Sequence, residues 1–263
     1  MQGVDLRCAA LIALASGISA PGIAAAAPTA VSSPASTSAD QQVRSRMATE
    51  IIEFIDPSDL AVATEVRGWE VGTRSVLQRD PGITKLNQEH PGLIDAAIAA
   101  GRGNATEYLR KVVANMKSKK AEILARRLSI AELTEVRAFV SSAAGQRFYR
   151  RLHAGSDVHA ITEDVLDRSE TSGTKVITRE NANQLLGSTM KKAAAQTSSE
   201  DALAIMKFQQ TAAAKQFGAA SDEAVQAVLE VANNPDPEFL SKQQDLLISA
   251  MIAFAEKPSS KKP

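Results

Sequence analysis

The chain has 263 residues, which is enough for one or two domains with a hydrophobic core, and its formal net charge is zero. A neutral chain has no global electrostatic attraction to polyanions, so nucleic acid is excluded as an expected partner. Aromatic residues make up only 4% of the chain and alanine is abundant, a composition that favours helices over sheets.

Residues 1–26 have the features of a secretory signal peptide. Arg7 gives a positive start, an apolar run follows, and Ala24 to Ala26 are the small residues that a signal peptidase requires before Ala27. The alternative is a transmembrane anchor, but glycine and proline interrupt the run and it barely reaches the ~20 residues of a span. Because no twin-arginine pair is present, we expect export by general secretion, to the periplasm if the host is Gram-negative.

The predicted cleavage limits the chemistry of the mature protein. The only cysteine, Cys8, lies in the signal peptide and is lost with it. A disulfide framework, a cysteine-ligated metal and a cysteine nucleophile are therefore excluded. Residues 27–42 follow, rich in Ala, Pro, Ser and Thr without an apolar period, and we expect a disordered linker there.

From residue 43 to residue 257 apolar side chains recur at the helical spacing almost throughout. We predict one all-α domain over this range, a multi-helix bundle built from helical hairpins. Asp56 and Pro57 end the first helix, and Pro81 follows the second. A disordered basic tail is expected at 258–263.

The longest predicted helix covers residues 105–127. Gly101 and Gly103 predict a break before it, and Asn104 with Glu107 has the spacing of a capping box. Outside its apolar stripe this helix is strongly basic. That surface is typical of a helix that docks on anionic lipid or an acidic partner, or of the solvated face of a bundle helix. The stripe contains no Trp or Phe, which favours the bundle helix.

The most informative stretch is 129–152. Ser129 and Glu132 have the spacing of a capping box, and Ser142 is placed to cap a second helix. This pattern predicts a helical hairpin whose key residues have structural roles. The predicted structural signature consists of Glu132, Leu133, Phe139, Ser142, Gly145, Gln146, Arg147 and Phe148.

These residues resemble the signature of a bacterial domain-of-unknown-function family, numbered 2059. Its pattern, E-L-x-x-[hydrophobic]-x-A-F-x-x-S-x-x-G-[QK]-[KR], is matched from Glu132 to Arg147. Val140 stands where the family usually has Tyr, and Ala143 where it usually has Pro, which weakens the start of the second helix. The resemblance implies an exported helical protein without an assigned activity.

A weaker copy of the hairpin recurs at an offset of 69 residues, where 198–217 aligns without gaps on 129–148. The capping serine and the spacing of two phenylalanines are repeated, which favours a degenerate internal duplication. Ala214 occupies the place of Gly145, so we predict that Gly145 is helical, lies against another helix and tolerates alanine. We also predict four buried aromatic side chains: Phe139, Phe148, Phe208 and Phe217.

No constellation of catalytic or metal-binding residues is evident. His153 with Asp157 and His159 with Glu163 are pairs four residues apart, but a metal site needs three or four converging ligands. Ser142 lies in no G-x-S-x-G pattern, and no phosphate-binding glycine pattern follows a strand. We therefore assign no catalytic, cofactor-binding or metal-binding residue and no cofactor, and we do not expect an enzyme.

The function predicted from these observations is a non-catalytic binding or structural module of the bacterial cell envelope, with the hairpin faces as its partner surface. The alternative is a carrier whose helices open around a lipid or another apolar ligand, which a large apolar cavity would favour. A hydrolase is the least favoured reading. The partner is unknown, and an envelope protein or a lipid is the class that we expect.

Overall fold

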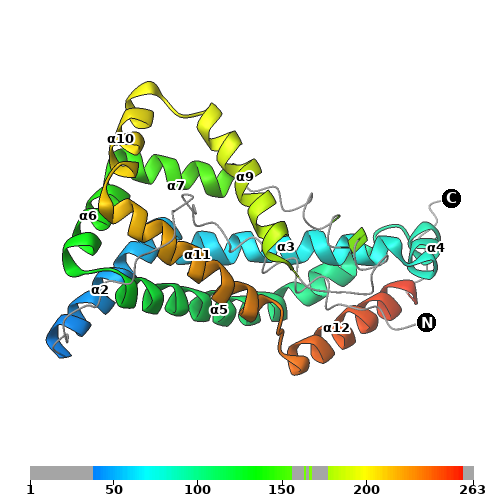
Figure 1. The fold of residues 1–263 in the computed structure, drawn as a ribbon. Helices are drawn as coiled ribbons and strands as arrows, with labels where there is room; N and C mark the ends of the chain where they lie inside the picture. Colours follow the sequence, from blue (N-terminus) through cyan, green and yellow to red (C-terminus); the bar gives the residue numbers. More distant parts are fainter. Residues whose placement is uncertain (1–37, 156–162, 164–165, 168–176, 257–263) are drawn as a thin grey trace.

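The computed structural model describes residues 38–155, 163, 166–167 and 177–256. In these residues the chain forms α-helices and no strand, which confirms the predicted all-α bundle (Figure 1). The helices are α2 (Ser38–Ile55), α3 (Ser58–Arg79), α4 (Pro81–Glu89), α5 (Leu93–Arg127), α6 (Ile130–Ser141), α7 (Ala143–Gly155), α9 (Arg179–Ala195), α10 (Ser199–Gln209), α11 (Ala212–Ala232) and α12 (Pro237–Ala255).

The first described helix begins earlier than predicted. Residues 38–42, which we assigned to the disordered linker, form the start of α2. Asp40 lies in this first turn, where the helix dipole stabilises a carboxylate. The buried apolar side chains between Met47 and Ile55 hold α2 against the rest of the protein. A helix that is formed in this way extends easily into adjacent residues that can adopt the helical conformation. The predicted signal peptide, residues 27–37 and the predicted tail lie outside the described residues.

The central element is α5, a single helix of 35 residues. The break that we predicted at Gly101 and Gly103 and the capping box at Asn104 are wrong, because α5 runs through all of them. A Cβ on Gly101 would lie 2.1 Å from Nε2 of Gln243 and 3.1 Å from the ring of Trp69. Glycine therefore lets α3 and α12 approach α5 closely and does not end the helix.

Asn104 binds α12 instead of capping α5. Its Nδ2 donates to Oε1 of Gln243 at 2.8 Å, and Nε2 of Gln243 donates to the carbonyl oxygen of Gly101 at 3.2 Å. The Gln243 side chain is buried, so both of its polar ends find partners inside the interface between α5 and α12.

Among the residues that the structure describes, two hydrophobic clusters, one toward each end of α5, form the core. The first contains Trp69 and joins α3 and α4 to the N-terminal part of α5, α12 and the C-terminal part of α11. The second joins α2 and the C-terminal part of α5 to α6, α7, α10 and the N-terminal part of α11. Figure 1 shows α5 running between the two ends of the molecule. α5, α9 and α11 therefore contribute side chains to both clusters.

Two helical hairpins, α6–α7 and α10–α11, lie at the end of α5 that carries the second cluster. The predicted capping box of Ser129 is confirmed: its Oγ accepts from the N–H of Glu132 at 3.3 Å, and the Glu132 carboxylate accepts from the N–H of Ser129 at 2.8 Å. Ser198 also caps α10, where its Oγ accepts from the N–H of Asp201 at 3.1 Å. Each hairpin therefore begins at a serine cap.

The rings of Phe139 and Phe208 connect the hairpins, stacked with their centroids 4.1 Å apart and their planes at 5°. Phe148, Phe208 and Phe217 are buried, as predicted. Phe139 is only partly buried, so the prediction is wrong for this residue. Its ring covers Phe208 and remains partly open to solvent.

Candidate functional site

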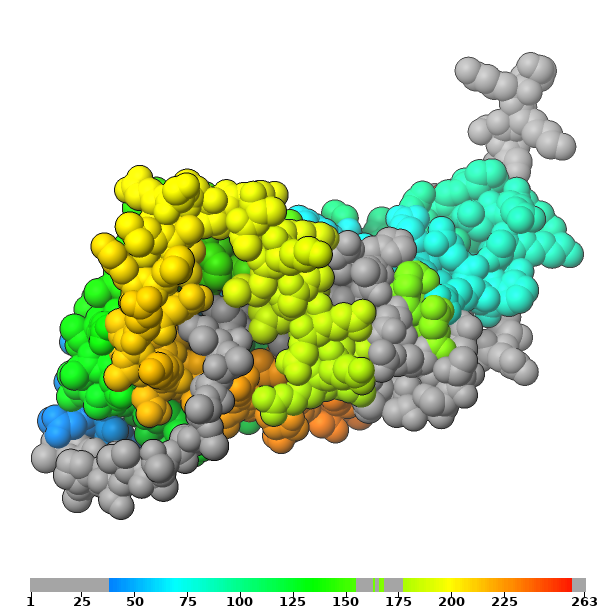
Figure 2. All heavy atoms as spheres, turned by 45° about the horizontal axis from the view of Figure 1, so that its top comes forward, coloured from blue at the N-terminus to red at the C-terminus, as the bar shows by residue number. Residues whose placement is uncertain are grey.

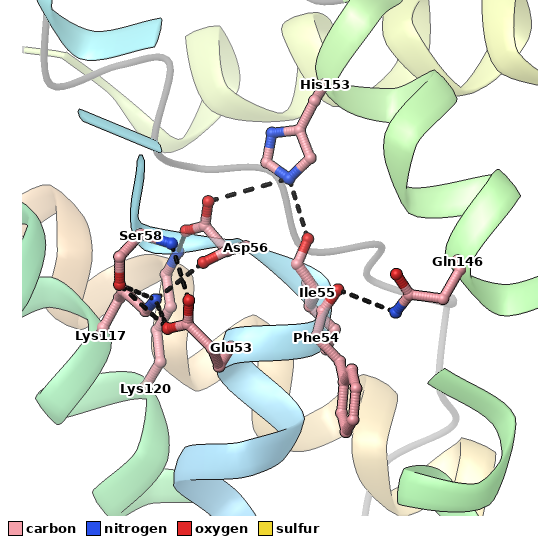
Figure 3. Close-up of polar contacts among 9 residues, drawn as sticks. All are labelled: Glu53, Phe54, Ile55, Asp56, Ser58, Lys117, Lys120, Gln146 and His153. Carbon is pink, nitrogen blue, oxygen red and sulfur yellow. Dashed lines mark hydrogen bonds and ion pairs between the residues drawn. The ribbon is translucent and has the colours of Figure 1, made fainter. Parts of the chain in front are cut away.

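Polar side chains from α5 and α7 converge on the C-terminal end of α2 (Figure 3). The last carbonyl groups of a helix have no partner within the helix. Here a side chain of another helix binds each of three consecutive carbonyl oxygens: Gln146 binds Phe54, His153 binds Ile55 and Lys117 binds Asp56. The three distances are 3.3, 2.8 and 2.8 Å. We call these three side chains, with Asp56 and Lys120, the α2 clasp.

A buried ion pair lies at the centre of the α2 clasp. Nζ of Lys120 is 3.3 Å from Oδ2 of Asp56, and the two side chains are only 6% and 8% exposed. Nε2 of His153 lies 3.8 Å from Oδ1 of the same carboxylate. Because a carbonyl oxygen only accepts, the contact with Ile55 requires that Nε2 of His153 carries a proton.

Lys117 extends the cluster to the surface. It donates to a carboxylate oxygen of Glu53 and, at 2.7 Å, to Oγ of Ser58. Burial alone would raise the pKa of Glu53, but hydrogen bonds from Lys117 and Ser58 outweigh it, so this pKa lies below its ordinary value. The clasp therefore joins α2, α3 and α5 through charged groups as well as through carbonyl caps.

A small, partly open cavity lies beside Lys120 and Asp56. Its other walls include Leu124, Phe217 and Ser221. A buried lysine beside a carboxylate is a possible nucleophile when a substrate reaches it. The free volume here is about 10 Å³, room for about one water molecule. This cavity does not admit a substrate, and the geometry favours a structural role for the ion pair.

Besides Glu132 and Phe148, two further residues of the predicted signature have capping or core roles in the first hairpin. Leu133 is fully buried. Ser142 is engaged on both sides, since its Oγ donates to the carbonyl oxygen of Phe139 at 2.7 Å and accepts from the nitrogen of Gly145 at 3.1 Å. Ser142 thus closes the end of α6 and the start of α7 with one hydroxyl.

Gly145 is helical and lies against another helix, as predicted, but it leaves no space for a methyl group. A Cβ at this position would lie 2.2 Å from the carbonyl oxygen of Phe139 and 3.1 Å from Cα of Val140. The backbone that passes closely is the end of α6, within the same hairpin. Our prediction that alanine is tolerated at position 145 is therefore wrong, although the corresponding Ala214 of the second hairpin is buried as well.

Gln146 ties the first hairpin to α2. Its Nε2 donates to the carbonyl oxygen of Val140 at 2.8 Å as well as to that of Phe54. The end of α6 and the end of α2 are therefore held by a single amide group.

Arg147 ties the first hairpin to the second. Its Nη2 and Nε bind the carboxylate of Asp201 at 2.6 and 3.1 Å, and Nη1 of Arg151 binds it at 3.0 Å. The Asp201 side chain is 1% exposed. Hydrogen bonds from Arg147 and Arg151 outweigh the effect of burial and hold the pKa of Asp201 well below its ordinary value.

The sequence did not reveal that Lys120 and Asp201 are buried. We assigned the cations of residues 105–127 to a solvated face, and this is wrong for Lys120. One signal was present, because Lys120 lies four residues from both Met116 and Leu124 and so continues their apolar stripe. Arg126 and Arg127, further along α5, both bind Glu223 of α11.

Among the described residues no group of three or more His, Cys, Asp or Glu side chains is arranged to hold a metal ion. Asp157 and His159 of the histidine pairs lie outside those residues. No helix in the described part of the chain has both the length and the apolar character to cross a bilayer.

The chain matches no protein-family model, no curated protein and no solved structure. The resemblance to family 2059 therefore stays a prediction from the signature residues.

Proposed function

We propose that this protein is a non-catalytic binding module of the bacterial cell envelope, which docks a protein partner on the outer face of α10 in the second hairpin. The proposal is carried by two apolar side chains of α10, Leu203 and Met206, which are 53% and 55% exposed. They are three residues apart in a helix and so share one face. Methionine is enriched in the cores of protein interfaces.

The position of α10 makes this pair suitable for binding. The opposite side of α10 is held to the first hairpin by Asp201, which binds Arg147, and by Phe208, which stacks on Phe139. A surface that is already fixed loses little conformational entropy when a partner binds. In Figure 2 the second hairpin, in yellow and gold, forms one corner of the molecular surface.

Comparison of the two hairpins supports the same surface. We interpret α10–α11 as a diverged copy of α6–α7, since Thr211 accepts from the nitrogen of Ala214 at 3.1 Å as Ser142 does in the first hairpin. At the offset of 69 residues, Leu203 and Met206 correspond to Thr134 and Arg137. The second hairpin thus has apolar side chains where the first has polar ones.

The small volume of the cavity beside Lys120 supports a binding module over a carrier that encloses its ligand there. A volume of about 10 Å³ has no space for an acyl chain. The same volume argues against a reaction at Lys120.

The test compares three forms of the protein in affinity capture from envelope extract of the native host, with mass spectrometry of both proteins and lipids. Leu203→Thr/Met206→Arg gives α10 the residues of the first hairpin. Ile252→Thr is the matched control, because Ile252 is similarly exposed on α12 at 51%. Exposed substitutions of this kind change the free energy of unfolding by less than about 0.5 kcal/mol, so all three forms should melt alike.

We expect one protein partner with the wild type and the control, and its loss with the double variant. The same proteins with all three forms, or lipid alone, would contradict the proposal.

A further inference from the structure

An open groove runs along the surface between α3 and α5, away from α10. Its volume is about 580 Å³, which falls in the range of roughly 300–1,000 Å³ typical of small-molecule sites. Three apolar residues of α3, Val62, Ala63 and Val66, line it. Ala63 is exposed, and the two valines are only partly buried. The groove therefore offers a strip of apolar surface to a ligand.

The groove also carries an excess of positive charge. Arg67, Arg102 and Arg110 line it together with two carboxylates, Asp59 and Glu70. Nε of Arg102 binds Oε1 of Glu70 at 2.6 Å, so these two charges neutralise each other.

Arg67 and Arg110 remain available to a ligand. Within the described part of the chain neither has a hydrogen bond or an ion pair. Arg110 acts electrostatically on Glu107 of its own helix, and Lys111 already binds that carboxylate at 3.1 Å.

The two arginines line the groove from different helices, Arg67 from α3 and Arg110 from α5. Lys117 contacts Ser58 at one end, and Arg102 contacts Glu70 at the other, so α3 and α5 run antiparallel. Residue 67 on α3 and residue 110 on α5 lie between these two contacts. Guanidinium groups bind carboxylate and phosphate oxygens through paired N–H donors.

We propose that this groove binds a small anionic amphiphile, with its acidic group between Arg67 and Arg110 and its aliphatic chain along Val62, Ala63 and Val66. The ligand lies on the surface and is not enclosed. This inference is independent of the docking surface on α10, and the two are tested separately.

The first test is isothermal titration of the protein with dodecanoate below its micelle concentration. The aliphatic chain of the ligand contributes because each of its methylene groups that the apolar strip half covers strengthens binding about twofold. The acid contributes through its charge. We therefore expect dodecanoate to bind more tightly than octanoate, than the neutral dodecan-1-ol and than acetate.

The second test removes each contribution separately. Arg67→Gln/Arg110→Gln should weaken dodecanoate binding about tenfold, because two exposed charge contacts are lost. Val62→Thr/Val66→Thr should weaken dodecanoate but leave the smaller response to acetate unchanged. Arg46→Gln is the control, since Arg46 is an exposed arginine of α2 outside the groove.

Three results would overturn the proposal. They are no heat of binding with dodecanoate, equal affinity for dodecan-1-ol, and unchanged affinity in Arg67→Gln/Arg110→Gln when circular dichroism shows that the variant is folded.

Discussion

Some single residues of this protein are constrained by packing neighbours that the adjacent sequence does not reveal. Gly145 is surrounded by the backbone of residues 139 and 140, and Gly101 by side chains of α3 and α12. Neither glycine ends a helix. In the sequence each is indistinguishable from Gly103, which has nothing within 4 Å of its Cβ position. The pattern therefore predicted that Gly145 is helical but not which substitution it accepts.

Gly145→Ala should destabilise the protein by about 1–3 kcal/mol, because the added methyl group meets backbone atoms that cannot rotate away. Gly103→Ala is the matched control, and it should stabilise by up to about 1 kcal/mol through helix propensity alone. Urea denaturation followed by circular dichroism measures both. Equal effects of the two substitutions would show that the end of α6 is not packed against α7 as described.

Asp201 makes the stability of the hairpin contact depend on pH. Its pKa in the folded protein is lowered from the ordinary 3.8. A group whose pKa is lowered in the folded state stabilises the fold at pH values above its pKa in the unfolded state. This stabilisation is lost as the pH falls toward the pKa in the folded state. We therefore expect Asp201→Asn to be destabilising at pH 6 and the difference from wild type to shrink from about pH 4 downwards.

Urea denaturation at a series of pH values measures that difference. The control is the same substitution in an Arg147→Gln/Arg151→Gln background, where the pH dependence should largely disappear. A difference that stays constant down to pH 2 would argue against the ion pairs.

At the scale of helices, the sequence predicted a helix start or end correctly where the atoms that determine it belong to adjacent residues. The caps at Ser129 and Ser198 and the ends at Asp56 and Asp80 follow from a few adjacent residues, and the structure has them at those positions. The predicted break in α5 failed because the reason for Gly101 lies on other helices. The α2 clasp could not be predicted either, since its donors come from α5 and α7 and meet only after the helices pack.

Lys120→Met should cost about 3–5 kcal/mol, because it leaves the buried carboxylate of Asp56 without its ammonium partner. Lys111→Met on the same helix is the control. Lys111 forms an exposed pair with Glu107, so its loss should cost less than about 0.5 kcal/mol. Chemical denaturation measures both.

Asp56→Asn added to Lys120→Met should recover part of the lost stability, because it removes the buried charge. Failure of this rescue would indicate that Lys120 matters through its aliphatic stem and not through the ion pair.

The whole molecule is organised by helices that belong to two hydrophobic clusters at once. Because α5, α9 and α11 contribute to both, we expect the clusters to unfold together. Trp69 is the only tryptophan of the chain and lies in the first cluster. Its fluorescence therefore reports on one cluster, whereas circular dichroism reports on all helices.

In the wild type the two probes should give coincident thermal transitions. Ser118→Pro interrupts α5 between Met116 of the first cluster and Ala121 of the second. This substitution should separate the two thermal transitions. Ser118→Gly costs less than about 1 kcal/mol and should leave them coincident. Separate transitions in the wild type would show that the clusters are independent.

The pairing of Asn104 with Gln243 also determines when the fold can be completed. These residues are 139 positions apart, so the interface of α5 with α12 waits for the last described helix. At a synthesis rate of ~5–20 residues per second, this interval is about 7–30 s. Contacts that are distant in the chain also form slowly. During export as we propose it, the interface of α5 with α12 would therefore form only after the C-terminal part of the chain has crossed.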